Sequence, residues 1–312
     1  HFRLAANIDL TNWDWTASPW VPIGSEQFPF IGTFDGAGYV IIGLLVKGVN
    51  DAGLFGKIAK EGTSAASIKN LQLLDVDILG NERVGGLVGY NAGGTVENSY
   101  VTGKVEGEKH VGGLVGKNEN GIVRDSYAAV STYGSGTMVG GLAGWNMEGI
   151  VENSFATGNV SGRLNVGGLV GFNGPVYGDN DGNNNGGMVS KSYANGDVTG
   201  TGQSVGGLVG ANRAIVQNSY AMGNVLGGSS SHIGGLVGAN GDTGSVEASY
   251  ATGNVAGSWY VGGLVGTNLG KVEGSYAAGN VHGSAYVGSL VGDGKLPDTE
   301  SKALDDTEMK QQ

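Results

Sequence analysis

Short apolar runs, separated by glycine and polar residues, recur along most of the chain at a fixed spacing. The hexapeptide Val-Gly-Gly-Leu-Val-Gly, or a close variant, begins at eight positions, which are Val84, Val111, Val139, Val166, Val205, Ile233, Val261 and Val287. The intervals are 26 to 28 residues, apart from one of 39 residues that holds an insertion near residues 174–187. A period of this length is typical of a solenoid, a propeller or another repeat array.

Each period contains about three β-prone runs: the aliphatic hexapeptide, a β-branched residue before a Ser-aromatic pair, and a Gly-x-Val segment. Interior glycine and β-branched residues disfavour helices. The pattern therefore predicts an all-β fold, a parallel β-helix or β-solenoid with about three short strands in each coil of ~27 residues. A propeller of WD type is the alternative, but it needs four longer strands in each blade.

Equivalent residues of successive coils are expected to stack at the strand spacing of ~4.8 Å. Two inward columns follow from the repeat, Leu87, Leu114, Leu142, Leu169, Leu208, Leu236, Leu264 and Leu290 in one and Val96, Val123, Val151, Val189, Val216, Val246 and Val272 in the other. An asparagine stands seven positions after most opening residues, at Asn91, Asn118, Asn146, Asn173, Asn212, Asn240 and Asn268. We expect these asparagines to form a structural ladder at one corner, with glycine providing thin walls and corners of positive φ.

The regularity of the pattern divides the chain into three segments. Residues 1–83 are expected to form irregular N-terminal coils and a cap, in which Trp13, Trp15 and Trp20 cover the end of the solenoid. Residues 84–292 carry the eight repeats, and residues 293–312 are expected to be a polar C-terminal tail or cap with a short helix near Asp305. The chain opens on residues that look like the middle of a strand, so we expect it to be part of a longer protein.

Composition narrows the possible partners. Glycine fills 63 of 312 positions, the net charge is −11, and there is no cysteine. Phosphate contacts need clustered cations, so nucleic acid and anionic membrane surfaces are unfavourable partners. The longest apolar stretch, residues 40–46, is far too short to span a membrane, so no membrane insertion is expected. The absence of cysteine also excludes disulfides, thiolate metal sites and cysteine nucleophiles.

The repeat resembles the GLUG-motif repeat family, whose core reads Gly86-Leu87-Val88-Gly89 in this chain. The resemblance extends roughly from Val84 to Gly292, and the stretch around Gly53-Leu54-Phe55-Gly56 looks like the leader that precedes such repeats. It implies a bacterial, secreted or surface-displayed β-helix of the kind found in adhesin-like and IgA-peptidase-associated proteins. The family offers no catalytic residue set to carry over.

The aromatic residue of each Ser-aromatic pair provides the main candidate for a binding surface. Stacked coils would align Tyr100, Tyr127, Phe155, Tyr193, Tyr220, Tyr250 and Tyr276 in one column. Facing outward, this column would offer a strip for glycan binding, and facing inward it would be part of the core. We favour the inward orientation, although alternation does not decide it, because a corner can fall between Val96 and Ser99.

Two weaker candidates involve carboxylates. The insertion contains Asp179, Asp181 and Asn183, oxygen ligands of the kind that calcium prefers, but a flexible loop is the favoured interpretation and no cofactor is expected. Glu247 and Glu273 would be neighbours on adjacent coils, where a carboxylate pair could perform acid–base chemistry. An outward, solvated column is again the simpler interpretation.

The sequence therefore favours a non-enzymatic, extracellular structural or adhesive module of a bacterial surface or secreted protein, with other surface proteins or glycans as partners. The alternatives are a glycan-binding module and a filament subunit that self-associates end to end. A polysaccharide-cleaving β-helix enzyme is the least favoured, because the repeat brings no reactive groups together.

Overall fold

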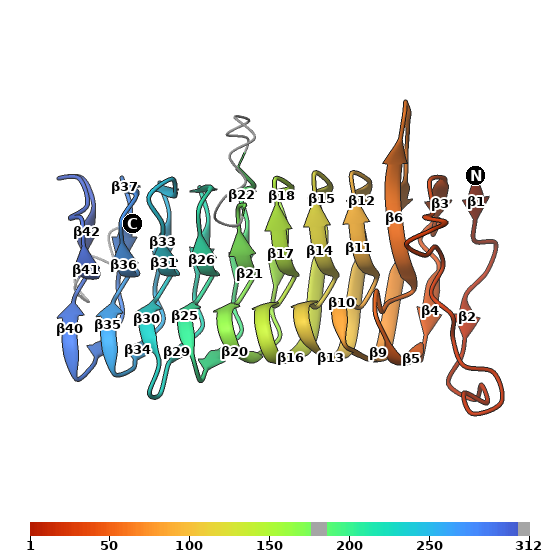
Figure 1. Ribbon diagram of the computed structural model, residues 1–312, viewed down its shortest axis with the longest axis horizontal. Helices are drawn as coiled ribbons and strands as arrows, with labels where there is room; N and C mark the ends of the chain where they lie inside the picture. The colour runs from red at the N-terminus through yellow and green to blue at the C-terminus, as the bar shows by residue number, and fades with distance from the viewer. Residues whose placement is uncertain (176–185, 305–312) are drawn as a thin grey trace.

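The computed structural model describes residues 1–175 and 186–304, which form 42 strands and no helix. The coils stack along one long axis, and the chain climbs from one end of the stack to the other (Figure 1). Strands of successive coils pair in parallel, as β12 does with β15, and one short antiparallel pair joins β6 and β7. The fold is thus the predicted all-β parallel β-helix.

Each coil passes through three sheets, which form the three faces of the solenoid. The first sheet contains β1 (Phe2–Arg3), β3 (Thr33–Asp35), β8 (Ser67–Lys69), β12 (Thr95–Glu97), β15 (Ile122–Arg124), β18 (Ile150–Glu152), β22 (Met188–Ser190), β27 (Ile215–Gln217), β32 (Ser245–Glu247) and β37 (Lys271–Glu273). The third contains β6 (Phe55–Glu61), β7 (Ser64–Ala65), β11 (Val88–Ala92), β14 (Val115–Glu119), β17 (Ala143–Met147), β21 (Val170–Asn173), β26 (Val209–Asn212), β31 (Val237–Asn240), β36 (Val265–Asn268) and β41 (Val291–Gly294).

The second sheet is the widest, and its strands are long in the early coils and broken into short pieces in the later ones. It contains β2 (Ile8–Asp9), β4 (Val40–Ile42), β5 (Leu45–Val49), β9 (Gln72–Gly80), β10 (Glu82–Gly85), β13 (Tyr100–Gly112), β16 (Tyr127–Gly140), β19 (Phe155–Ala156), β20 (Val160–Gly167), β23 (Tyr193–Ala194), β24 (Val198–Gly200), β25 (Gln203–Gly206), β28 (Tyr220–Ala221), β29 (Val225–Leu226), β30 (Ser231–Gly234), β33 (Tyr250–Ala251), β34 (Val255–Ala256), β35 (Trp259–Gly262), β38 (Tyr276–Ala277), β39 (Val281–His282), β40 (Ala285–Gly288) and β42 (Lys302–Ala303).

The interior is a set of apolar columns that run the length of the stack. The leucines of the repeat from Leu87 to Leu264 are fully buried, and Leu290 in the last coil is partly buried against them. The valine column from Val96 to Val272 is at most 3% exposed. Both predicted columns therefore face inward, where parallel strands of neighbouring coils bring identical side chains together.

Two buried polar ladders accompany the apolar columns. Each asparagine of the repeat donates from Nδ2 to Oδ1 of the asparagine in the next coil, at 2.8 to 2.9 Å, from Asn91 through to Asn268. At a second corner, the Ser99 hydroxyl donates to the Glu97 carbonyl oxygen, and the Ser126 hydroxyl accepts from the Ser99 N–H. Buried polar groups of the interior therefore find hydrogen-bond partners in the equivalent residues of neighbouring coils.

The motif glycines provide the thin walls that were expected, whereas most corners of positive φ are formed by other residues. Left-handed backbone occurs mainly at other residues, such as Asn98 with φ of 44° and His110 with φ of 52°. The motif glycines instead permit close approach of neighbouring coils, because a Cβ on Gly113 would lie 2.1 Å from the carbonyl oxygen of Gly141. Glycine is therefore required in the hexapeptide mainly because a side chain would clash with the backbone of the neighbouring coil.

The first 83 residues continue the same stack with larger side chains. Trp15 and Trp20 pack against the core, whereas Trp13 is 52% exposed, so only two of the three tryptophans cover the apolar interior. Phe55 contacts the rings of Phe30 and Phe34, each with a centroid distance of 5.3 Å. The described residues contain no helix that could cross a membrane.

Candidate functional site

The aromatic residues of the Ser-aromatic pairs lie on the outer surface of the second sheet. Ser99 and Val101 on either side of Tyr100 are buried, and Tyr100 itself is only half-buried. The same alternation holds along the column, which we call the tyrosine column (Tyr100, Tyr127, Phe155, Tyr193, Tyr220, Tyr250 and Tyr276). The expectation that it faces inward was therefore wrong. Asn98 adopts left-handed backbone between Val96 and Ser99, and this corner reverses the alternation of the side chains.

The rings of the tyrosine column stack face to face. Neighbouring centroids lie 4.6 to 4.9 Å apart, with interplanar angles of 2° to 9°. Each ring thus covers the faces of its neighbours, and only ring edges and hydroxyl groups are left toward solvent. A sugar ring binds an aromatic residue through the ring face, so the interior of this column offers it little to stack on.

The other predicted site residues serve structure or lie outside the described ranges. The asparagine ladder is buried, so its amides hold the coils together. Asp179, Asp181 and Asn183, the calcium candidates, lie outside the described residues. Among residues 1–175 and 186–304, no three His, Asp or Glu side chains are placed to hold a metal ion.

The paired glutamates are neighbours, as expected, on the outer surface of the first sheet. Glu247 and Glu273 occupy equivalent positions on β32 and β37. The Lys271 Nζ atom lies 2.7 Å from Glu273 Oε2 and 3.7 Å from Glu247 Oε1. All three side chains are well exposed, so they form a solvated ion-pair group on a flat sheet.

The outer surface of the third sheet, which we call the groove face, divides into two halves. One row of outward residues there stands immediately before each ladder asparagine. In the filled half this row carries the large side chains Tyr90, Lys117, Trp145 and Phe172. In the open half it carries Ala211, Ala239 and Thr267 on β26, β31 and β36.

Charged groups cover the aromatic rings of the filled half. Lys117 Nζ lies 4.5 Å from the centroid of the Trp145 ring and 5.1 Å from that of Tyr90, and it pairs with Glu119 Oε2 at 2.6 Å. The Tyr90 hydroxyl donates to Glu119, and burial together with this bond raises the pKa of Tyr90. His110 lies against Trp145, with a centroid distance of 5.1 Å. Burial lowers the pKa of His110 to about 4, so its imidazole is neutral at pH 7.

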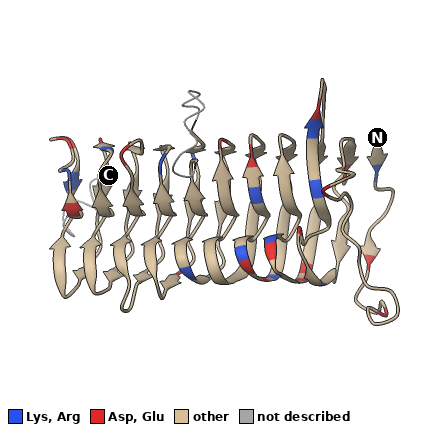
Figure 2. Ribbon diagram, viewed as in Figure 1, with Lys and Arg blue, Asp and Glu red and all other residues tan. Residues whose placement is uncertain are grey.

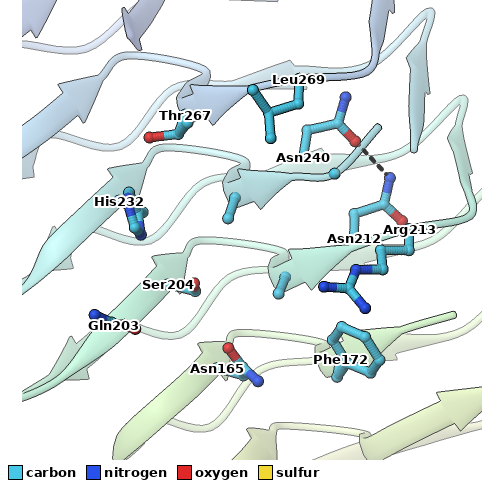
Figure 3. Close-up of a pocket in the computed structure, with 13 residues that line it drawn as sticks. Asn165, Phe172, Gln203, Ser204, Asn212, Arg213, His232, Asn240, Thr267 and Leu269 are labelled. Carbon is cyan, nitrogen blue, oxygen red and sulfur yellow. Dashed lines mark hydrogen bonds between the residues drawn. The ribbon is translucent and has the colours of Figure 1, made fainter. Parts of the chain in front are cut away.

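The open half contains a groove of about 290 Å³, shown in Figure 3. Its floor is formed where Ala211 and Ala239 replace the large residues of the filled half, and Phe172 and Thr267 stand at its two ends. Four successive coils therefore contribute to one depression. The groove exists because two short side chains follow each other in a row that is otherwise bulky.

Polar side chains without hydrogen-bond partners in the described residues border one long side of this groove, and the ring of one of them, His232, stacks on Tyr260. Asn165, Gln203, Ser204 and His232 come from the corner before the hexapeptide, and Figure 3 shows them along one edge. Within the described part of the chain, their side-chain polar atoms make no hydrogen bond to protein. The Thr267 Oγ1 atom at the end of the groove is buried and also unpaired among these residues. Unpaired polar groups in a partly closed space are favourable partners for a ligand.

The remaining boundary of the groove is formed by Asn212, Arg213, Asn240, Gly241 and Leu269. Leu269 and the stem of Arg213 follow the ladder asparagines, and the Arg213 guanidinium lies 5.7 Å from the Phe172 ring centroid. Burial lowers the pKa of His232, and Asp293 opposes this shift, so the imidazole tends to be neutral. A neutral imidazole can both donate and accept a hydrogen bond. This arrangement is suited to binding a polar, uncharged ligand.

Sequence reasoning missed the groove although the signal was in the sequence. The row before the ladder asparagine reads Tyr, Lys, Trp, Phe and then Ala, Ala, Thr. Reading one position down the repeats for side-chain volume would have located the depression. The positions that stay the same from repeat to repeat do not reveal the groove.

Comparisons with known proteins agree with the repeat. The model of the GLUG motif matches residues 80–106, 107–132, 135–161, 229–256 and 257–281. Halomucin of Haloquadratum walsbyi is 34% identical over 118 residues, which is 34% of this chain and 1% of halomucin. The chain thus spans about 1% of the length of this curated relative. A crystal structure from Bacteroides ovatus, described as a "putative immunoglobulin A1 protease", has a TM-score of 0.45 and 20% identity over 93% of this chain and 77% of its own.

Proposed function

We propose that this chain, which carries five matches to the GLUG motif, acts as a rigid, non-enzymatic structural or adhesive module outside the cell. The match to halomucin supports a place among extracellular repeat proteins, because a mucin is by name a secreted or surface-associated protein. Other surface proteins or glycans are its proposed partners. End-to-end self-association stays a prediction.

The continuous interior columns carry this proposal. The asparagine ladder crosses seven successive coils without a gap, and the leucine and valine columns beside it are buried over the same length. Each coil is therefore tied to the next by backbone pairing, a side-chain amide and apolar contacts at once. Such a scaffold resists bending between repeats and holds its outer faces at a fixed orientation.

The outer faces support a binding or spacing role over catalysis. Glu247 and Glu273, the carboxylate pair nearest to an acid–base arrangement, share the ammonium group of Lys271 on a flat, exposed sheet. A glycosidase places its two carboxyl groups on opposite sides of a bound sugar bond, within a cleft. The exposed ion-pair group has no such geometry.

Two measurements test the proposal. Small-angle X-ray scattering of the purified chain is expected to give a rod-shaped particle whose dimensions stay constant from low to high salt. Incubation with neutral and acidic polysaccharides is expected to release no new reducing or unsaturated ends, with a heat-denatured sample as the control. Flexible bending in the scattering curve would contradict the structural role, and released sugar ends would contradict the non-enzymatic role.

A further inference from the structure

We propose that the groove between Phe172 and Thr267 binds a neutral saccharide, one or two sugar units of a longer glycan at a time. This inference rests on the proposed adhesive function, for which it names a glycan site, and it is independent of the rod-shaped scaffold. It assigns a glycan site to the groove face and moves it away from the tyrosine column, whose ring faces cover one another.

The size and shape of the groove fit a short stretch of a sugar chain. Its volume of about 290 Å³ stands near the lower limit of ligand sites, which is roughly 300 Å³. The floor formed by Ala211 and Ala239 carries only short side chains, and residues from four successive coils line the depression. A sugar chain lying along the stack would therefore contact successive coils with successive parts of its length.

The hydrogen-bonding groups match hydroxyl chemistry. Sugar hydroxyls both donate and accept, and so do the amides of Asn165 and Gln203, the hydroxyl of Ser204 and the neutral imidazole of His232. These groups have no protein partner among the described residues, so a ligand supplies bonds that the folded chain leaves unmade. Leu269 is 48% exposed and offers apolar surface to the C–H groups of a sugar ring.

Charge favours a neutral ligand over a nucleic acid or an acidic polymer. Between residues 198 and 241 the sequence has one Lys, Arg, Asp or Glu side chain, that of Arg213. Figure 2 shows the same contrast, with charged residues gathered on the coils around β6 to β14 and few on the coils around β25 to β35. Anionic polymers need several cations in register, and one guanidinium is not enough for them.

An extended peptide fits the groove less well than a sugar chain. Peptides that bind β-proteins usually add a strand to an open sheet edge. The floor strand β31 pairs with β26 on one side and β36 on the other, so its backbone groups are already used. Recognition must therefore come from side chains.

The sharpest test fills the groove without disturbing the scaffold. Ala239→Phe places in the open half a ring of the kind that Phe172 carries two coils away in the same row, so the variant is expected to fold. Wild-type chain and variant are titrated calorimetrically with cellotetraose, mannotetraose, xylotetraose and chitotetraose. We expect binding of at least one of them by the wild type and a loss of more than about tenfold in affinity in the variant, because a filled floor removes most contacts.

A second variant and a matched control keep the result interpretable. The double variant Asn165→Ala, Gln203→Ala removes two hydrogen-bonding groups and is expected to weaken binding by about tenfold or more. Ala129→Phe adds the same ring on the second sheet and should leave binding unchanged. Thermal unfolding and circular dichroism of each variant report whether the fold is intact.

Three outcomes would overturn the assignment. The first is no measurable binding of any of the four tetrasaccharides by the wild-type chain at millimolar concentration. The second is equal affinity of wild type and Ala239→Phe, which would place the glycan elsewhere. The third is binding of tetragalacturonate alone, which would contradict a neutral ligand. None of these results bears on the rod shape, so the scaffold proposal is tested separately.

Discussion

The two halves of the groove face share one scaffold and differ in what stands on it. In the filled half, Tyr90, Lys117, Trp145 and Phe172 pack along the row, and charged groups cover their rings. In the open half, Ala211 and Ala239 leave a groove with unpaired polar groups on its border. The backbone register is the same in both halves. In this fold, stability therefore comes from the interior ladders. The properties of the outer surface depend on one outward row, whose side chains can change from coil to coil.

The largest expected effect concerns the interior that both halves share. Asn118→Ala in the filled half and Asn240→Ala in the open half each remove an amide that bonds two neighbouring asparagines and local carbonyl groups. Several buried polar groups then lose their partners, so each variant should lose about 4 kcal/mol of unfolding free energy. Urea denaturation measures this. Costs that differ by more than about 2 kcal/mol would show that the halves do not share one scaffold.

The next effect separates the halves. Trp145→Ala removes a ring that is 8% exposed and whose Nε1 donates to the Gly174 carbonyl oxygen. We expect a loss of about 3 kcal/mol, because the ring packs between His110 and Phe172. Ala239→Phe, the opposite change in the open half, should alter stability by less than about 1 kcal/mol. Thermal unfolding of both variants checks this, and equal losses would remove the distinction between the halves.

Acid is expected to act mainly on the filled half. The pKa of His110 is lowered from 6.5 to about 4 in the folded chain, because burial disfavours its charged form. Below pH 6.5 the unfolded chain therefore binds a proton that the folded chain does not, and stability falls as the pH falls toward about 4. We expect a loss on the order of 1–2 kcal/mol between pH 6.5 and about pH 5.

The pH effect is checked by urea denaturation of His110→Asn across this range. Asparagine tolerates the left-handed backbone at this position, as Asn165 does in the equivalent place. The variant should show a weaker dependence on pH than the wild type. Because the pKa of His232 is lowered in the same direction, His232→Asn in the open half serves as the comparison. If the unfolding free energy of His110→Asn depends on pH as strongly as that of the wild type, other groups are responsible for the acid sensitivity.

The smallest expected effect concerns the charges above the rings. Lys117→Met keeps the length of the side chain but removes the ammonium group between Tyr90 and Trp145 and its pair with Glu119. Cation–π contacts and ion pairs near the surface contribute about 1 kcal/mol or less, and salt screens them. The variant should lose that amount at low salt and less at high salt. A salt-independent loss would mean that packing of the lysine stem dominates.

Much of the architecture was predictable from the sequence, because it repeats. Leu87 and Val96 recur at fixed intervals, and only a stacked parallel coil brings every copy into one buried column. The asparagine ladder followed from the same argument, since a buried amide must find partners and an identical amide in the next coil provides one. The periodicity of the sequence was therefore sufficient to predict the interior.

The outer surface was less predictable, and the tyrosine column shows why. Counting alternation from Val96 places Tyr100 inside, and a single left-handed residue, Asn98, places it outside. No single residue type marks such a corner in the sequence, because asparagine, aspartate, lysine and alanine all occupy it in different coils. The groove depends on Ala211 and Ala239, which look like ordinary variation until the register of the four coils that line it is known.

The asparagine ladder also gives the molecule a direction. Every amide donates toward the coil that follows it in the chain, from Asn91 to Asn268, so the side-chain dipoles all point the same way. Aligned dipoles in a low-dielectric interior polarise one another and add up along the axis. The ladder is consequently a polar array whose two ends are unlike. Two solenoids placed end to end would continue the direction of the ladder only if they met head to tail.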